Sequence, residues 1–362
     1  MAAPAGTSAT VHSFGVYVHI PFCARRCDYC AFATWTDRPH LMEAYTDACR
    51  AEVAAADLPP ATSVFFGGGT PSLLPADLLT SILETIVRAP DAEVTVECNP
   101  ETVTAAALDA YHRAGVNRLS FGVQSMVPHV LASLGRAHDP HTVVRAVGLA
   151  GAAGFTSFNV DLIYGAAAET DDDWRRTLDT VLALEPAPPH VSAYALTVEP
   201  GTPLAADAAR HPDDDVQAER YLMAEARLGA AGLRSYEISN WAAPGHECRH
   251  NLLYWSQGDY RGIGCAAHSH LAGRRWWNVR TPERYISLVA SGRSAEAGAE
   301  TLDDETRRLE GLQLSLRTRA GVPADALADD DRLEGLLWRR EDRVGLTTAG
   351  RLLANEVALH LR

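Results

Sequence analysis

The sequence predicts an α/β fold of six β–α units, followed by a smaller, mainly helical C-terminal domain. Two observations predict it. Short β-rich runs alternate with helical stretches from about residue 14 to residue 231, which is the pattern of parallel strands joined by crossover helices. Glycine and polar residues follow the ends of these runs, where α/β barrels carry their chemistry. The alternation alone is compatible with either a barrel or a doubly wound sheet.

Each predicted strand ends in a turn or in a polar segment. The first, Phe14–Phe22, leads into three closely spaced cysteines, and the second, Ser63–Phe66, ends in a run of three glycines. Gly67, Gly68 and Gly69 there are followed by Thr70. The remaining strands are predicted at Glu93–Glu97, Arg118–Val123, Ser157–Leu162 and His190–Thr197.

Capping signals mark the predicted helices. Pro75–Arg88 begins with proline, whose missing N–H costs nothing in a first turn. Ala105–Ala114 and Pro140–Ala153 are each followed by glycine, a frequent C-terminal cap. Asp171–Leu184 has acidic residues in its first turn, where the helix dipole favours them. Two more helices are predicted at Pro39–Ala56 and Asp215–Ala231.

The pattern changes after about Ser235. The segment Trp241–Trp277 is rich in glycine, histidine and aromatic residues, which predicts hairpins and loops. Helices are predicted at Asp303–Thr318 and Asp330–Leu361, with a short wing near Gly345. We therefore expect a core domain at 14–240 and a C-terminal domain at 241–362. Residues 1–13 are expected to form a disordered lead, since they lack the segments of a signal peptide.

Composition excludes several classes of protein. A chain of 362 residues with 47% hydrophobic and 22% charged residues is globular and can bury a large core. Its net charge of −14 argues against a nucleic-acid partner, which needs a basic surface. All 32 basic residues other than histidine are arginine, so lysine chemistry is excluded. No apolar run approaches the ~20 residues of a membrane-spanning helix, so we do not expect an integral membrane protein.

Three cysteines, Cys23, Cys27 and Cys30, are spaced C-x3-C-x2-C. Thiolates are soft ligands that suit iron–sulfur clusters, and three ligands for the four irons of a [4Fe–4S] cube leave one iron open for a small molecule. An incomplete zinc site and simple burial are the alternatives, but no second cysteine pair completes a set of four zinc ligands.

The other four cysteines, Cys49, Cys98, Cys248 and Cys265, are scattered singly. Cys98 and Cys265 are expected to lie in the core or to line the site. The absence of a paired framework suits a reducing compartment and predicts a cytoplasmic protein.

The run from Tyr17 to Cys30 resembles the radical S-adenosylmethionine (SAM) superfamily, whose C-x3-C-x2-C loop leaves one iron for SAM. Its flanking residues, Tyr-Val-His-Ile-Pro-Phe-Cys, resemble one branch more closely. That branch contains the oxygen-independent coproporphyrinogen III oxidases and the haem chaperones of the HemW family. The resemblance extends from about Val16 to the C-terminal helices, and it implies that the six β–α units form the partial (β/α)6, TIM-like barrel of the superfamily.

SAM needs acceptors for its ammonium group and ribose hydroxyls, and close backbone approach along its methionyl part. Glycines at a strand end provide backbone without side chains. Glu97, Gln124 and Asp161 end three predicted strands and should point into one mouth, and Arg136 can pair with a carboxylate. By resemblance, the SAM positions are Tyr17, Gly68, Gly69, Thr70, Glu97, Gln124, Arg136, Asp161 and Ala195. Tyr29 is expected to pack over the cluster and the adenine.

The resemblance implies one-electron chemistry. A reduced cluster can cleave SAM to methionine and a 5′-deoxyadenosyl radical that abstracts hydrogen from a substrate, while the protein positions the groups and excludes water.

Two departures from the oxidase pattern favour the HemW family. The oxidases carry a further cysteine two residues after the third ligand, where this chain has Phe32. They also have a long N-terminal extension, whereas here the cluster loop begins at Cys23.

The segment from His250 to Trp255, His-Asn-Leu-Leu-Tyr-Trp, resembles the H-N-x-x-Y-W motif of the HemW family. An imidazole can ligate haem iron, and the aromatic rings offer flat contact to a porphyrin, so His250 is the predicted haem ligand. His268 and His270 are competing ligands, and Trp276 and Trp277 are expected in the core.

The resemblance implies a chaperone with a [4Fe–4S] cluster, SAM and haem, which passes haem to an acceptor protein such as a respiratory, membrane-bound one. An oxygen-independent coproporphyrinogen III oxidase and another radical SAM enzyme remain as alternatives.

Overall fold

The computed structural model describes residues 13–328 and 330–362, so the predicted lead, apart from Ser13, lies outside the described residues. One sheet of 12 strands dominates the fold, in the order β12-β11-β10-β9-β1-β2-β3-β4-β5-β6-β8-β7. Its strands are β1 Phe14–Ile20, β2 Ala61–Gly68, β3 Arg88–Cys98, β4 Arg118–Gln124, β5 Phe158–Tyr164, β6 His190–Ala195, β7 Arg234–Ser235, β8 Asn240–Ala242, β9 Asp259–Ile263, β10 His268–Leu271, β11 Arg274–Asn278 and β12 Glu296–Thr301.

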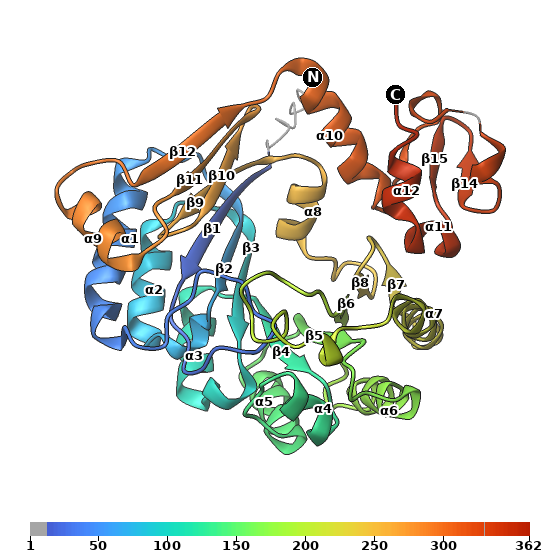
Figure 1. Cartoon of the computed structure of the whole chain (residues 1–362). Coiled ribbons are helices and arrows are strands. Elements are labelled where there is room, and N and C mark those ends of the chain that lie inside the picture. The colour runs from blue at the N-terminus through green and yellow to red at the C-terminus, as the bar shows by residue number, and fades with distance from the viewer. Residues whose placement is uncertain (1–12, 329) are drawn as a thin grey trace, which may run out of the picture.

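The sheet curves into an incomplete barrel (Figure 1). Strands β1 to β6 are adjacent and parallel in chain order, and β9 adds a seventh parallel strand beside β1. The pairings at both ends are antiparallel, and within the described residues the edge strands β12 and β7 do not pair with each other. The predicted α/β fold with a partial barrel is therefore confirmed, and the doubly wound alternative is excluded.

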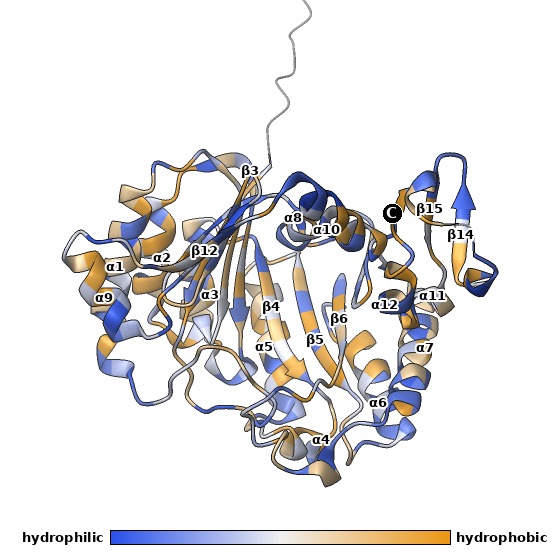
Figure 2. Cartoon of the chain, turned by 45° about the horizontal axis from the view of Figure 1, so that its top comes forward, coloured by the Kyte–Doolittle hydropathy of each residue, from blue (hydrophilic) through white to orange (hydrophobic). Residues whose placement is uncertain are grey.

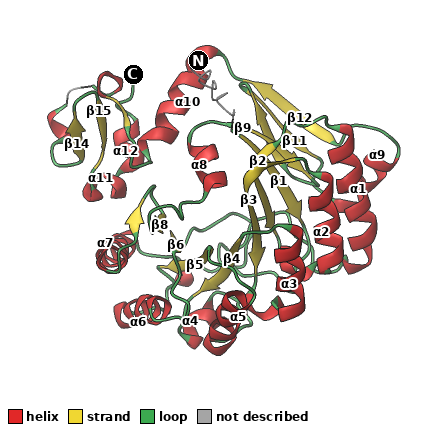
Figure 3. Cartoon of the chain, turned by 180° about the vertical axis from the view of Figure 1, so that it is seen from behind, coloured by secondary structure: helices red, strands yellow, loops and turns green. Residues whose placement is uncertain are grey.

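Helices cover the outer face of the barrel (Figures 1 and 3). They are α1 Met42–Ala55, α2 Ala76–Thr85, α3 Ala105–Ala114, α4 Pro128–Ser133, α5 Pro140–Ala152, α6 Asp171–Leu182 and α7 Asp214–Ala230. The expected glycine cap is present in α3, which ends at Gly115 in the left-handed region (φ 95°). The expected acidic first turn is present in α6, where Thr170 and Asp173 also form a capping box that was not predicted. The short helix α4 was not predicted from the sequence.

Strand alternation separates an apolar outer face from a polar interior, because successive side chains point to opposite faces of a strand. On β1, Val16, Val18 and Ile20 belong to the core beneath the helices, whereas Tyr17 lines an internal cavity. Both hydrophobic and hydrophilic residues appear along β4 and β5 in Figure 2. Ser120, Asn159 and Asp161 line the same internal cavity, so the barrel interior holds polar groups.

The hairpin predicted within Trp241–Trp277 is present, because β10 and β11 pair antiparallel, but the segment is not otherwise loop. It contains α8 Arg249–Trp255, on the concave side of the sheet, and strand β9, which lies parallel to β1 (Figures 1 and 3). A seven-residue helix is too short to leave a clear periodicity, and β9 is defined only by its distant partner. Helices α9 Pro282–Ala290 and α10 Asp304–Leu316 follow, and α10 confirms the predicted helix there.

The predicted helix Asp330–Leu361 is wrong. The segment contains β14 Leu337–Arg340, β15 Arg343–Leu346, α11 Thr348–Leu352 and α12 Ala354–Ala358, and β15 also pairs with β13 Val322–Pro323. The predicted wing residue, Gly345, lies within this hairpin, where a Cβ would come within 2.4 Å of the Trp338 ring. The predicted short wing is therefore present as this hairpin, and it interrupts the predicted helix.

These last elements form a lobe with its own hydrophobic core, beside α7 (Figures 1 and 2). Strands β9 to β12 instead extend the main sheet, so the division into domains at residue 240 stays a prediction. Within the part of the chain that the structure describes, no helix has the length and apolarity needed to span a bilayer.

Candidate functional site

The three cysteines lie in a closed loop that follows β1. The loop is held at its base because Cys23 N donates to Trp35 O at 3.0 Å and Trp35 N donates to Pro21 O at 2.8 Å. Cys23, Cys27 and Cys30 are half-buried free thiols. The three candidate ligands therefore share one short, tied segment at the carboxyl ends of the parallel strands.

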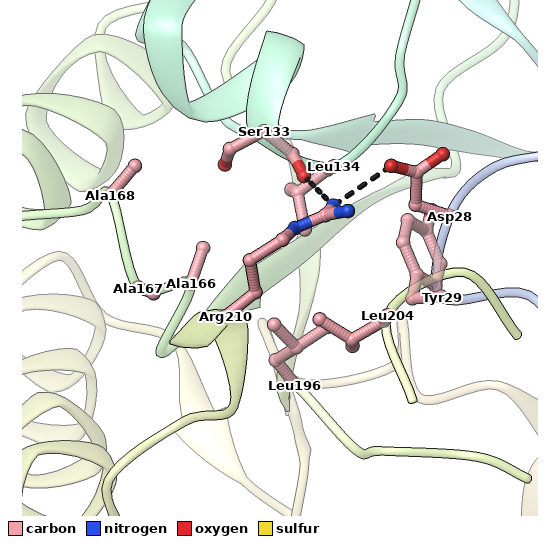
Figure 4. A pocket seen from close by; sticks show the side chains of 10 residues that line it. All are labelled: Asp28, Tyr29, Ser133, Leu134, Ala166, Ala167, Ala168, Leu196, Leu204 and Arg210. Carbon is pink, nitrogen blue, oxygen red and sulfur yellow. Dashed lines mark hydrogen bonds and ion pairs between the residues drawn. The ribbon is translucent and has the colours of Figure 1, made fainter. Parts of the chain in front are cut away.

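A side-chain ion pair anchors the middle of this cluster loop. Arg210 donates to the Asp28 carboxylate at 2.8 Å and to Ser133 O at 2.6 Å. Leu204 N also donates to Asp28 O at 3.0 Å. These contacts border a small cavity of about 260 Å³ that Tyr29 lines from the loop side (Figure 4). The end of α4 and the segment after β6 therefore hold the cluster loop in place.

The glycine run after β2 touches the cluster loop directly. A Cβ at Gly69 would lie 2.7 Å from Phe22 O and 3.1 Å from Cys23 Sγ, so no larger residue fits there. Gly68 has φ +112° and donates its N–H to Glu97 at 3.1 Å. Thr70 donates its hydroxyl to Cys23 Sγ at 3.6 Å. The run is thus a cradle of bare backbone, as the resemblance implied.

Arg136 reaches the same loop from the segment between α4 and α5. Its guanidinium donates to Cys27 Sγ at 3.5 Å, to Asn99 Oδ1 at 2.9 Å and to Gly122 O at 2.8 Å. Its buried Nε has no hydrogen-bond partner among the described residues. The structure therefore places the Arg136 guanidinium beside the Cys27 thiol, and its Nε–H remains available to donate to a ligand.

The residues present fit a [4Fe–4S] cluster. Burial raises the pKa of the Cys23 and Cys30 thiols, so ligand binding would release their protons. Among the described residues, no three His, Cys, Asp or Glu side chains surround a single point as the ligands of one metal ion do. A cube needs no such point, because its thiolates bind different irons.

Glu97, Gln124 and Asp161, which were predicted to end three strands, lie at two different depths in the barrel. Glu97 is next to last in β3, and Gln124 ends β4 with φ +66°, a left-handed conformation that is uncommon outside glycine and often marks a constrained site. The placement of Asp161 at a strand end is wrong, because β5 continues to Tyr164. Asp161 lies deeper, where it accepts from Ser120 at 3.0 Å and from Asn159 at 2.7 Å.

Glu97 and Asp161 line one interior cavity of about 240 Å³. Burial, and secondarily the charge of Asp161, raises the pKa of Glu97 to about 8. Burial likewise raises the pKa of Asp161. The buried Arg118 lines the same cavity and partly offsets the negative charge of Asp161, so Glu97 is the carboxyl group in the cavity that is left to pair with a cationic group.

The remaining predicted SAM positions surround this region. Tyr17 lies inside the barrel with its hydroxyl 3.0 Å from His19 Nδ1, and Ala195 ends β6. Tyr29 packs against an apolar cluster that includes Leu134 and Leu196. The SAM roles of these residues stay predictions.

Sequence reasoning missed several residues that complete the site. Asn99 donates to Thr70 Oγ1 at 3.2 Å and accepts from Arg136, and its place directly after β3 was a usable signal. Asp28 and Arg210 form the anchor described above, and nothing in the local sequence around Arg210 indicates that role. Cys98 and Cys265 are buried in the core, as expected.

His250, the predicted haem ligand, is buried, and both its ring nitrogens are hydrogen bonded. Its Nδ1 is 2.9 Å from Ser63 Oγ, and its Nε2 is 2.8 Å from Tyr254 Oη. Its backbone N donates to Glu93 at 3.0 Å. Burial lowers the pKa of His250 to about 3. Helix α8 thus closes the barrel interior through His250, and iron ligation would require one of these hydrogen bonds to break, so the ligand role stays a prediction.

The two competing histidines differ from each other. His270 is buried, with Nδ1 2.9 Å from Gly258 O and Nε2 accepting from Gly273 N at 3.2 Å. His268 is exposed and stacks on Trp277 with ring centroids 5.8 Å apart. Trp276 is buried, as expected of a core residue, whereas Trp277 is half-buried.

Comparisons with known proteins agree with this geometry. The family model described as the radical SAM superfamily matches residues 17–181. A protein named heme chaperone HemW from Mycobacterium tuberculosis is 44% identical, over 95% of this chain and 93% of its own. A heme chaperone HemW from Escherichia coli is 36% identical, over 94% and 96%. The solved coproporphyrinogen III oxidase HemN of E. coli superposes with a TM-score of 0.83 at 25% identity, over 96% and 89%.

Proposed function

Since the chain belongs to the HemW family of radical SAM proteins, we propose that it is a cytoplasmic haem chaperone that binds haem and passes it to an acceptor protein. The observation that carries this proposal is the similarity over nearly the whole chain to relatives named heme chaperones. The acceptor is expected to be a protein that works with haem, such as a respiratory membrane protein.

Cys23, Cys27 and Cys30 would hold a [4Fe–4S] cluster with one open iron, and this cluster together with SAM supplies one-electron chemistry when bound. Residues around the cysteines would affect the reduction potential of the cluster. Thr70 and Arg136 donate hydrogen bonds to two of the three sulfurs, and such bonds influence the reduction potential of a cluster.

SAM would lie between the cluster loop and the carboxyl ends of β2 to β6. The backbone of Gly68 and Gly69 can approach its methionyl part without steric conflict, and Gln124 and Ala195 lie at the ends of β4 and β6, with β5 between them. The raised pKa of Glu97 favours its neutral form until a positive group such as the SAM ammonium approaches and stabilises the carboxylate.

The coproporphyrinogen III oxidase reading remains the second candidate, because HemN shares the fold. The fold therefore cannot separate the two functions. Phe32 favours the chaperone, because the oxidase pattern has a cysteine at this position. Phe32 is 67% exposed. A different radical SAM activity on another substrate is the third candidate.

An anaerobic haem titration of the cluster-reconstituted protein tests the proposal. Bound haem is measured after desalting by its pyridine complex, since the cluster also absorbs in the visible range. Saturation near one haem per chain, followed by transfer of that haem to an acceptor, supports the chaperone. Turnover of coproporphyrinogen III without saturable haem binding would support the oxidase instead.

A further inference from the structure

A third cavity, of about 670 Å³, lies beside the cluster loop and adjoins the smaller cavity that His250 lines, with Tyr17 and Tyr254 lining both. Three segments form its walls. Tyr17, His19 and residues 31–33 contribute one wall, α8 to β11 another, and Leu302 with α10 the third. Its volume lies within the roughly 300–1,000 Å³ that ligand pockets occupy, whereas the 240 Å³ cavity beside His250 falls below that range.

The walls of this large cavity offer flat aromatic surface. Tyr254 and Tyr260 pack edge to face with centroids 4.6 Å apart, and Tyr17 lines the same space. Phe32 lies at its border on the cluster loop, and its exposed ring has little contact with the protein. A large planar apolar ligand would cover these rings and remove the exposed apolar surface of Phe32 from water.

Three histidines line this cavity, and two of them are already hydrogen bonded at both ring nitrogens. His19 is 3.0 Å from Tyr17 Oη and 2.9 Å from Ala33 O, and His270 bonds to backbone groups on both sides. The ring of His268 has no hydrogen bond to any described residue, and it is oriented by stacking on Trp277. His268 is therefore the imidazole that can ligate a metal without breaking an existing bond.

The cavity also contains a cation that is free to pair. Arg275 is paired with Glu300 at 2.9 Å and with Glu310 at 3.0 Å. Arg280 is exposed and makes no ion pair or hydrogen bond with the described residues. An anionic group on a ligand in this cavity would find a guanidinium in Arg280.

We propose that haem binds in the 670 Å³ cavity, with His268 rather than His250 as its iron ligand and Arg280 as the partner of a propionate. The inference rests on the proposed function and assigns that function to a place in the molecule. It puts the porphyrin between the cluster loop and α10, so that both the cluster domain and the C-terminal segment contact the cargo.

The test uses the cluster-reconstituted protein with two probes, ferric haem and metal-free protoporphyrin IX. Ferric haem reports iron ligation through its absorption and EPR spectra, and protoporphyrin IX reports occupancy of the cavity through its fluorescence. The variants are His268→Gly, Arg280→Gln and the exposed control His141→Ala on α5.

The His268→Gly variant is expected to bind ferric haem about tenfold or more weakly, with an altered spectrum that free imidazole restores. Its affinity for protoporphyrin IX should stay within about threefold of the wild type, since only the iron contact is lost. The Arg280→Gln variant is expected to weaken both probes by a similar factor, roughly tenfold. His141→Ala should match the wild type.

Each contrary result overturns a different statement. If the wild type binds neither probe, the proposed function and this inference both fail. If the wild type binds haem and His268→Gly keeps the same affinity and spectrum, the ligand assignment is wrong while the chaperone proposal stands. If both variants bind protoporphyrin IX and haem like the wild type, the porphyrin lies elsewhere.

Discussion

Arg210 and Asp28, which are 182 positions apart in the chain, form a 2.8 Å ion pair that holds the residue between Cys27 and Tyr29. The same guanidinium donates to Ser133 O, so the cluster loop is joined to the end of α4 and to the segment after β6 (Figure 4). A three-cysteine loop has little packing of its own. Its conformation depends on residues that contribute no ligand.

Removal of this anchor should weaken cluster retention. We expect Arg210→Ala to lower the free energy of unfolding by only about 1 kcal/mol, since the pair is partly exposed, yet to speed iron loss to a chelator severalfold. The control is Arg175→Ala, which removes an exposed pair with Asp172 on α6. Equal rates of iron loss in the two variants would contradict the anchoring role.

Gly69→Ala should abolish stable cluster binding. Its Cβ would lie 2.7 Å from Phe22 O and 2.9 Å from Ile20 O, and backbone atoms at these distances cannot move aside independently. The matched control is Gly148→Ala within α5, where a Cβ meets nothing within 4 Å and where we expect a gain of about 0.5–1 kcal/mol. Iron and sulfide content after reconstitution, with thermal unfolding, measures both. A fully loaded Gly69→Ala protein would refute this account of the cradle.

Glu97 should make stability decrease as pH rises. Its pKa in the folded protein is about 8, above the ordinary value of 4.5, so the folded state binds more protons between these values. The stabilisation linked to that proton is complete below about pH 4.5 and is lost as pH rises towards 8. Glu97→Gln should therefore be more stable than the wild type by up to about 4 kcal/mol at pH 8 and by less than about 1 kcal/mol at pH 5. Denaturant unfolding of the cluster-free protein at both pH values measures this, and parallel pH profiles would exclude it.

His250→Ala should destabilise the barrel. The change leaves Ser63 and Tyr254 without their shared partner and opens a cavity beneath α8, which together should cost about 2–4 kcal/mol. Denaturant unfolding measures the loss, and Asn251→Ala, which removes one 3.3 Å hydrogen bond to Tyr236, is the milder comparison. A His250→Ala protein of wild-type stability would mean that its hydrogen bonds are not structural.

Much of the core fold could be predicted because its signals are local. The helix Ala105–Ala114 was predicted with its observed bounds, since Gly115 ends it and Thr104 caps it. The lobe after residue 330 could not be predicted from the sequence, because its hairpin depends on contacts such as that of Gly345 with Trp338. Asp161 was misplaced for a similar reason, as the length of β5 is set by its pairing with β6 up to Tyr164 and Ala195.

The sequence by itself determined the family, the three cysteines and the order of the β–α units, because motif spacing and strand–helix alternation are written along the chain. Only the tertiary structure decided which histidine is free to act. His250 looked available within its motif, yet Ser63 and Tyr254 occupy both its ring nitrogens, whereas His268 lines the larger cavity with its ring unbonded among the described residues. The availability of a side chain depends on partners from other strands and helices, and folding alone brings those partners into contact.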